Sequence, residues 1–216
     1  MSVEKKNEEN TPQQPNEEKK KKVRAEILSW VEVIVVAVVL ALFIDNVIII
    51  NATIPSGSME KTIMTGDRII GARFLYWFND PARGDIVVFK YPIDEAKGLN
   101  TKFIKRVIGL PGETVEIKDG AVYIDGDKLE EDYINGTWVV ENDGYRFDVP
   151  EDHYLMLGDN RNNSSDARYW PSLALKEGVT DNVEEALTFS YVQRKKILGK
   201  ALFCYWPFRD FGSLYS

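Results

Sequence analysis

The hydrophobic pattern begins with one long apolar stretch. Residues 27–44 read ILSWVEVIVVAVVLALFI, and with the following DNVIII the weakly polar stretch reaches the roughly 20 residues that a bilayer-spanning helix needs. Glu32 lies near its beginning, where a long side chain can reach the headgroup region. The pattern predicts a transmembrane helix over 27–46, and a buried core helix is the less favoured alternative for so continuous an apolar run.

A polar, charged segment precedes this stretch. Residues 1–26 contain 7 Lys/Arg and 6 Asp/Glu and almost no large apolar side chains, which predicts a disordered tail because little apolar area is available to offset the entropy of ordering. A basic cluster at 19–22 lies before the span, and Asp45 follows it. Positive charge collects on the cytoplasmic side of membrane helices. We therefore expect a single-pass protein of the cell membrane with a cytoplasmic N-terminus and an extracytoplasmic domain over 47–216.

The same pattern also describes a cleavable secretory signal. The apolar stretch is longer than such a signal has, and the INATIPSG that follows lacks a clear small-x-small cleavage site. An uncleaved signal anchor is therefore the preferred interpretation. The VIII at 47–50 fits a lipid-docking segment and a first core strand or helix end about equally well.

Beyond residue 50 the apolar runs become short, and Gly, Pro, Asn and Asp separate them. This pattern is typical of a mostly antiparallel β domain, and the Asp-Gly pairs at 119–120 and 125–126 are strong hairpin signals. One helix is expected over 182–193. The expected strands are 67–72, 85–91, 102–109, 114–118, 121–124, 153–157 and 200–205.

The composition narrows the class of protein. A chain of 216 residues with 44% hydrophobic content can bury a core and holds one or at most two domains. The net charge of -7 gives no basic field, so we expect no nucleic-acid partner. Cys204 and His153 are the one cysteine and the one histidine, which excludes an intramolecular disulfide and a His/Cys zinc site. We expect no metal and no cofactor.

Two segments carry candidate chemistry. The IPSGSM at 54–59 places Ser56 and Ser58 around a glycine, a pattern that alone indicates only a turn. Lys105 lies within an apolar strand, where alternation sets it on the same face as Phe103 and Val107. Burial disfavours an ammonium and lowers its pKa from about 10.4, so a buried Lys105 can act as a general base. The alternative is that its side chain extends into solvent at the strand edge beside Arg106.

A third segment, GDNRNNSSDAR at 158–168, packs many hydrogen-bonding groups directly after a predicted strand. These segments, in this order after an N-terminal membrane span, resemble bacterial type I signal peptidases. The resemblance rests on PSGSM, GDIVVF at 84–89, FIKRVIGLPG at 103–112 and GDNRNNSSDAR, and it covers most of residues 27–216. It implies a mostly β fold, with an antiparallel β-sheet catalytic domain of the signal-peptidase type behind an N-terminal transmembrane helix.

The resemblance also implies an activity. The chain is expected to be a membrane-bound serine endopeptidase that removes N-terminal signal peptides from secreted preproteins, whose residues at the first and third positions before the cleavage site are small. Ser58 would be the nucleophile and Lys105 the general base of an acyl-enzyme mechanism. The Ser56 hydroxyl and the Ser58 backbone N–H would form the oxyanion hole.

Further roles follow from the same resemblance. Ser164 corresponds to a serine that hydrogen-bonds the lysine, and Asp166 with Arg168 to a supporting ion pair. The residues matching the small apolar substrate pockets are Ile54, Met59, Ile63, Phe103 and Ile104. Membrane lipid is the second expected partner, because Ser58 lies only about 14 residues beyond the apolar stretch and so must work close to the outer membrane surface.

The sequence departs from the family pattern at several places. Lys61 stands where the family often has proline, and Ala167 replaces a common serine. The segment 171–195 is longer than the usual link, and we interpret it as a surface insertion that carries a helix. The link between FIKRVIGLPG and GDN is short, which indicates a compact catalytic domain.

Three other hypotheses were weighed against this one. Ser58, His153 and Asp159 could form a rival triad, since such triads recur in varied chain order. A self-cleaving regulator could share the Ser/Lys chemistry, although the membrane span and the lack of a DNA-binding segment disfavour it. A membrane-tethered binding module with an inert site is the third.

Overall fold

The computed structural model describes residues 15–139 and 143–215 of the chain. The chain divides into two compact units, Met1–Ile44 and Asp45–Ser216, and each is described by itself. The first part of the predicted tail, residues 1–14, lies outside the described residues.

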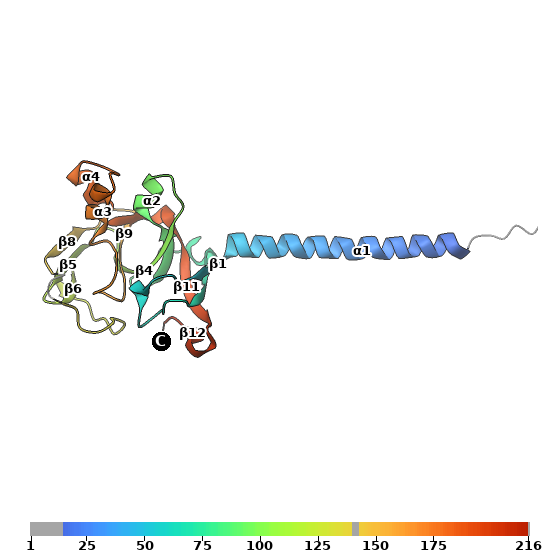
Figure 1. The fold of residues 1–216 in the computed structure, drawn as a ribbon, viewed down its shortest axis with the longest axis horizontal. Coiled ribbons are helices and arrows are strands. Elements are labelled where there is room, and N and C mark those ends of the chain that lie inside the picture. The colour runs from blue at the N-terminus through green and yellow to red at the C-terminus, as the bar shows by residue number, and fades with distance from the viewer. Residues whose placement is uncertain (1–14, 140–142, 216) are drawn as a thin grey trace, which may run out of the picture. The chain divides into compact units, whose positions relative to one another are not determined.

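The first unit is built on one helix. Helix α1 (Pro15–Phe43) passes into a short π-helical turn, η1 (Ile44–Ile48) (Figure 1). The span Lys19–Ile48 is long and apolar enough to cross a membrane, and none of its most apolar window is buried. This exposure disfavours the alternative of a buried core helix. The helix begins at Pro15 rather than near residue 27, because Lys and Glu favour helix and Pro suits its first turn.

The second unit contains a large antiparallel sheet. Its strands lie in the order β1-β2-β11-β3-β4-β9-β10, and β12 pairs with β11. Each strand turns alternate side chains to opposite faces, so Ile86 and Val88 of β3 enter one apolar cluster while Val87 and Phe89 enter another. The bounds are β1 (Ile49–Thr53), β2 (Arg68–Ala72), β3 (Ile86–Lys90), β4 (Lys102–Gly109), β9 (His153–Leu157), β10 (Tyr191–Gln193), β11 (Ile197–Trp206) and β12 (Gly212–Ser213).

A smaller sheet packs over part of the large one. Its order is β7-β6-β5-β8, and its apolar face shares a core cluster with β3, β4 and β9. The turns at 119–120 and 125–126 have positive φ at both residues, as the Asp-Gly signal predicts. The bounds are β5 (Thr114–Lys118), β6 (Ala121–Ile124), β7 (Asp127–Lys128) and β8 (Tyr145–Asp148).

The strand predictions are confirmed, with ends that shift by a few residues. The strands β7, β8, β10 and β12 are absent from the expectation, because each has only two to four residues and carries a weak alternation signal. At 47–50 the interpretation as a first strand is confirmed for Ile49 and Ile50, which begin β1, and Ile50 is 5% exposed. Val47 stays exposed.

Short helices complete the unit. They are α2 (Pro92–Ala96), α3 (Trp170–Lys176) and α4 (Val183–Thr188), with 3-10 turns η2 (Gly57–Met59), η3 (Phe74–Tyr76), η5 (Arg194–Lys196) and η6 (Phe208–Asp210). The helix expected over 182–193 is half as long, because the chain enters β10 at Tyr191. Asn182 caps α4 by accepting from the backbone of Glu184 and Glu185.

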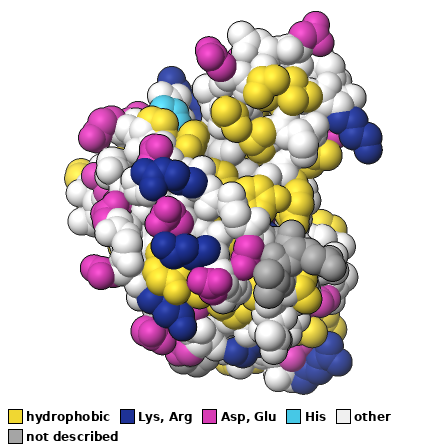
Figure 2. Space-filling model, turned by 90° about the vertical axis from the view of Figure 1, so that its left-hand side faces the viewer, with side chains coloured by type: hydrophobic (Ala, Val, Ile, Leu, Met, Phe, Trp, Pro, Cys, Tyr) yellow, Lys and Arg dark blue, Asp and Glu magenta, His cyan; other side chains and the backbone are white. Residues whose placement is uncertain are grey.

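The segment 171–195 is only partly a surface insertion. Trp170 and Ala174 on α3 are fully buried in the larger core cluster, and Figure 1 shows α3 and α4 beside β9. The Trp170 ring contacts Tyr91, Phe89 and Phe103, and the last stacks on Tyr91 with ring centroids 4.0 Å apart. This aromatic cluster fixes the start of β4, which leads to the site. On the outer face drawn in Figure 2, acidic, basic and hydrophobic side chains are interspersed.

Candidate active site

Ser58 lies on the tight 3-10 turn η2, just after β1. The segment 158–168, here called the GDN loop, holds this turn through Asn160. Asn160 Nδ2 donates to the Gly57 carbonyl at 3.0 Å, and the Asn160 backbone N–H donates to the Ser58 carbonyl at 3.1 Å. Ser58 is 7% exposed. The turn therefore presents one hydroxyl in a nearly closed setting and leaves it little freedom to move.

Lys105 reaches this hydroxyl from the middle of β4. Its Nζ lies 2.7 Å from Ser58 Oγ and 3.0 Å from the Ile104 carbonyl oxygen, and the Phe103 ring centroid is 5.3 Å away. The residue is 3% exposed, so the alternative of a lysine extended into solvent is wrong. The strand alternation that places Lys105 beside Phe103 also aims it at Ser58.

The surroundings of Lys105 change its ionisation. Burial disfavours the ammonium and lowers the pKa of Lys105 to about 8, while the carboxylates of Asp166 and Asp159 act in the opposite direction. Desolvation is the larger effect. A substantial fraction of the amine is therefore neutral slightly above pH 7, which a solvated lysine does not achieve.

Ser56 stands on the open side of the same turn. Its backbone is extended (φ -136°, ψ 156°), and its side chain caps no backbone N–H of η2. Ser56, Ser58 and Lys105 line one cavity of about 460 Å³. The structure thus brings the Ser56 hydroxyl to the cavity that holds the Ser/Lys pair.

The supporting residues lie behind the pair. Asp166 and Arg168 form a fully buried ion pair, with Nε and Nη2 each 2.8 Å from a carboxylate oxygen. Asp166 also accepts from the Gly158 N–H at 3.1 Å. Ser164 is buried against Gly158, but its hydroxyl makes no hydrogen bond within the described part of the chain, and so none to Lys105. Ser164 is therefore close to the site, as expected, but the expected hydrogen bond from Ser164 to Lys105 is missing.

A second buried ion pair ties the elements of the site together. The Asp159 carboxylate accepts from Arg106 Nε at 2.8 Å and Nη2 at 2.6 Å, and from Thr62 Oγ1 at 2.5 Å. Arg106 follows Lys105 on β4, and Thr62 follows Ser58 by four residues. Asp159 therefore links both dyad-bearing segments. Sequence reasoning missed this role, although Arg106 next to a buried lysine in a strand is an available signal.

Residues 129–139, here called the strap, run from β7 across the GDN loop. Glu131 forms a buried ion pair with Arg161 at 2.5 Å, and the Tyr133 ring lies 3.8 Å from the Arg106 guanidinium carbon. The Trp138 ring contacts both Arg161 and Arg168, with its centroid 4.9 and 5.4 Å from their guanidinium carbons. The strap thereby covers the ion pairs that hold the loop. Its aromatic and acidic side chains gave no motif signal.

The expected substrate-pocket residues separate into two groups. Ile54, Phe103 and Ile104 line a cavity of about 250 Å³, and Phe103 and Ile104 also line the cavity at Ser58. Met59 and Ile63 are fully buried in the core cluster of β1 and β3 and line neither cavity. Met59 ends the turn η2 and Ile63 follows it, and both side chains pack into the core rather than into a cavity. They therefore support the site and do not contact a substrate there.

The rival histidine triad finds no support in the geometry. His153 begins β9, whereas Asp159 follows its end. The His153 ring nitrogen Nδ1 contacts the Glu151 carbonyl at 2.8 Å, and Asp159 is paired with Arg106. Over the described ranges, no hydrogen bond joins His153 to Ser58 or to Asp159.

Lys61 adopts a backbone conformation that proline cannot. Its φ is 85°, whereas the proline ring locks φ near -65°. Lys61→Pro, the residue the family often has, is therefore expected to lower the free energy of unfolding by more than about 1 kcal/mol. Lys61→Asn, which tolerates positive φ, is the matched control and should stay within about 0.5 kcal/mol. Both lose the bond from Lys61 Nζ to the Asp132 carbonyl. Equal denaturation midpoints in detergent would contradict the expectation.

A serine hydroxyl within hydrogen-bond distance of a buried amine, on an antiparallel β fold with a cavity alongside, is an arrangement found among the serine peptidases that use lysine in place of histidine. A family model described as "Signal peptidase, peptidase S26" matches residues 27–206. The chain belongs to this signal peptidase family.

Two curated relatives agree with this assignment, and a solved structure also matches part of the chain. The chain is 39% identical over 203 residues to the probable signal peptidase I-2 of Synechocystis sp., covering 92% of this chain and 83% of that protein. It is 39% identical over 215 residues to the signal peptidase I of Leptolyngbya laminosa, covering 94% and 93%. A crystal structure of a signal peptidase I from Enterococcus faecalis V583 is 28% identical, with a TM-score of 0.37, and covers 56% of this chain and 97% of its own.

The family membership carries a function at a coarse level. Signal peptidases remove signal peptides from secretory preproteins, so the chain is a protease with preprotein substrates. This outcome contradicts the hypothesis of a binding module with an inert site. Helix α1 is compatible with membrane anchoring.

Proposed function

We propose that the chain is a membrane-bound serine endopeptidase in which Ser58 and Lys105 perform signal-peptide removal through an acyl-enzyme. The observation that carries the proposal is the 2.7 Å separation of Lys105 Nζ and Ser58 Oγ inside a nearly closed site. That distance is within the range in which a general base takes a proton. The lowered pKa of Lys105 supports the same role.

The proposed reaction has two halves. With Lys105 neutral, the Ser58 hydroxyl donates its hydrogen bond to Nζ, and the oxygen attacks the scissile carbonyl as the proton moves to the amine. The ammonium then gives this proton to the leaving amine, and an ester to Ser58 remains. Lys105 next takes a proton from water, which attacks the ester, and Ser58 is released with its proton restored. Atoms and protons balance without a metal or a cofactor.

The oxyanion of each tetrahedral intermediate needs donors. The Ser58 backbone N–H and the Ser56 hydroxyl are proposed to supply them, since Ser56 and Ser58 both line the cavity that contains Lys105. The buried Asp166–Arg168 pair is proposed to hold Gly158, and through it the wall beside Ser164.

The substrate is proposed to bind as an extended strand. Among the described strands, β1 pairs only with β2, and the Lys102–Lys105 part of β4 pairs only with β3 because β9 joins from Arg106 onward. These two unpaired edges flank the groove, so a peptide can add main-chain hydrogen bonds there. Ile54, Phe103 and Ile104 narrow the groove beside Ser58, which favours small residues at the first and third positions before the cleavage site.

The proposed topology follows the charge pattern. Residues 1–26 would lie in the cytoplasm, 27–46 would cross the membrane as an anchor, and 47–216 would lie outside, since Lys and Arg precede the span. Lipid contact by the exposed Val47, next to the span, is part of the same proposal. The short segment between the proposed membrane span and Ser58 would keep Ser58 close to the membrane surface, because so few residues cannot reach far.

The rate of preprotein cleavage is expected to follow the ionisation of Lys105. A general base works only when deprotonated, so kcat/KM should rise about tenfold per pH unit below the Lys105 pKa and level off above a midpoint near pH 8. The measurement is cleavage in detergent of a preprotein added in trans. Cleavage in trans also distinguishes this function from that of a self-cleaving regulator.

The control for this profile is His153→Ala. A midpoint near pH 6.5 that this variant abolishes would indicate a histidine base and overturn the proposal. An unchanged midpoint in His153→Ala, with most of the activity retained, is the expected result.

A further inference from the structure

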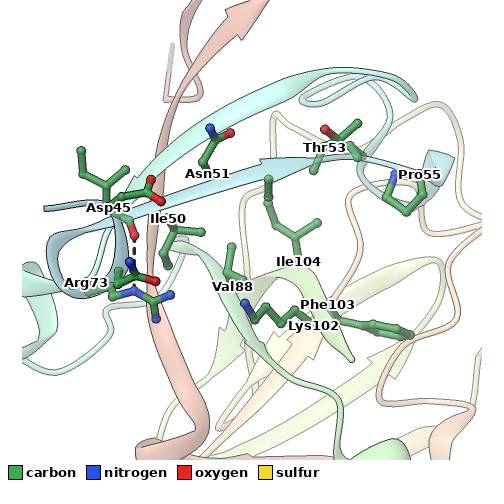
Figure 3. Close-up of a pocket in the computed structure, with 14 residues that line it drawn as sticks. Asp45, Ile50, Asn51, Thr53, Pro55, Arg73, Val88, Lys102, Phe103 and Ile104 are labelled. Atoms are coloured by element: carbon green, nitrogen blue, oxygen red, sulfur yellow. Dashed lines mark hydrogen bonds between the residues drawn. The ribbon is translucent and has the colours of Figure 1, made fainter. Parts of the chain in front are cut away.

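The groove beside Ser58 has a polar, charged far end that the proposed catalytic steps do not use. Its cavity runs from Pro55, Phe103 and Ile104 to Asp45, Asn46 and Arg73. The cavity that holds the dyad is lined by four of the same residues, Pro55, Lys102, Phe103 and Ile104, so the two spaces form one groove. Figure 3 shows Thr53 and Pro55 at one end of this groove and Asp45 and Arg73 at the other.

The length of the groove determines which part of a substrate reaches this end. An extended chain advances about 3.3 Å per residue, so the five residues of β1 span roughly 16 Å. Arg73 lies at the far end of β1, because its N–H donates to the Ile48 carbonyl and its Nε donates to the Ile49 carbonyl. A peptide whose scissile bond lies at Ser58 therefore places about its fifth and sixth preceding residues here.

The charges at this end are unbalanced. Arg73 and Lys102 bring two positive charges and Asp45 one negative charge. None of the three forms an ion pair with another described residue. Figure 3 shows the Lys102 side chain extending along the groove toward Arg73. The result is a net positive subsite at the end of an otherwise apolar groove.

The chemistry of a secretory signal supplies a matching group. Its apolar segment precedes the cleavage site, and a segment in lipid must satisfy its backbone groups by forming a helix. The last four carbonyls of such a helix lack intrahelical partners and carry partial negative charge. An extended stretch of five or six residues between helix and scissile bond brings those carbonyls to Arg73 and Lys102.

We propose that Arg73 and Lys102 form a specificity-determining subsite that binds the C-terminal carbonyls of the apolar signal-peptide helix and disfavours Lys and Arg at the fifth and sixth positions before the cleavage site. This inference rests on the proposed function. It adds that the enzyme distinguishes substrates by the charge of residues that precede the small residues at the cleavage site. Acidic side chains at these positions are favoured for the same electrostatic reason.

The test uses three preproteins that differ only at the sixth position before the cleavage site, which carries Gln, Glu or Lys. For the full chain in detergent at low salt, kcat/KM for Glu should exceed that for Lys about fivefold, the upper range for exposed charges. The ratio should fall toward one at high salt, where exposed charges are screened. It should also reach one in the double variant Arg73→Gln/Lys102→Gln, and Asp45→Asn should increase it.

Controls separate this inference from the function on which it rests. Lys128→Gln removes an exposed positive charge on β7 in the other sheet and should leave the Glu-to-Lys ratio unchanged. Lys102→Gln alone should lower the Glu-to-Lys ratio part of the way toward one, because it removes one of the two positive charges of the subsite. Equal rates for all three substrates in the wild type would overturn the subsite and leave the peptidase intact. Failure to cut any of them would overturn the proposed function itself.

Discussion

Lys105→Ala is expected to reduce preprotein cleavage by at least about 10⁴-fold, the scale seen when one member of a nucleophile-base unit is removed. The physical reason is that Ser58 then has no base within reach, since Lys105 Nζ is 2.7 Å from its oxygen and His153 contacts Glu151 instead. Ser58→Ala should have an effect of the same size. The measurement is single-turnover cleavage of a preprotein in detergent.

The double variant makes this prediction sharper. Because the two side chains act as one unit, Ser58→Ala/Lys105→Ala should be no slower than either single variant. His153→Ala is the matched control and should retain most of the activity. If Lys105→Ala still cuts at a tenth of the wild-type rate, Lys105 is not the base. Circular dichroism of each variant checks that the fold is intact.

Gly158→Ala is expected to have the second largest effect, at least about 100-fold on kcat, because it displaces the nucleophile itself. A Cβ at this position would lie 2.3 Å from Ser164 Oγ and 2.4 Å from the Ser58 carbonyl oxygen. The Ser58 contact is with backbone, which cannot rotate away, so the turn η2 has to shift. Overpacking of this kind also destabilises by about 1–3 kcal/mol, and a shift of 1 Å at a reacting atom can decrease the rate about 10²-fold.

Gly212→Ala is the control for Gly158→Ala. Gly212 has no atom within 4 Å of the position that a Cβ would take, and it needs no positive φ. It should therefore be neutral in both activity and stability. Wild-type kcat in Gly158→Ala would show that the turn tolerates displacement and that tight positioning of Ser58 is unnecessary.

The burial of Lys105 could be predicted from sequence because its signals are local. Alternation along β4 sets Lys105 on the face of Phe103, and its place between apolar residues predicts burial. Most strands were also predictable, since Asp-Gly turns and short apolar runs mark their ends. The family resemblance added the pairing of Ser58 with Lys105, which no local rule contains.

The parts of the fold and site that could not be predicted depend on contacts between segments that are distant in the sequence. The Asp159 bridge joins Arg106 to Thr62, and only the folded sheet brings these residues together. The strap has no regular secondary structure in the described residues, so no periodicity marks it. Met59 and Ile63 could not be assigned to core or groove by their apolar character, because both environments favour it. Short edge strands such as β10 likewise lack a pattern of their own.

The aromatic cluster around Trp170 has a consequence for engineering. The Trp170 ring packs against Phe103, whose neighbour Ile104 lines the groove. A shortened version of the chain would therefore have to keep the residues that pack on Trp170. Removal of α3 would take away the support under the strand that carries the base. The link 177–182 between α3 and α4 cannot be trimmed freely either, because Thr180 is buried and Val179 packs against the core cluster.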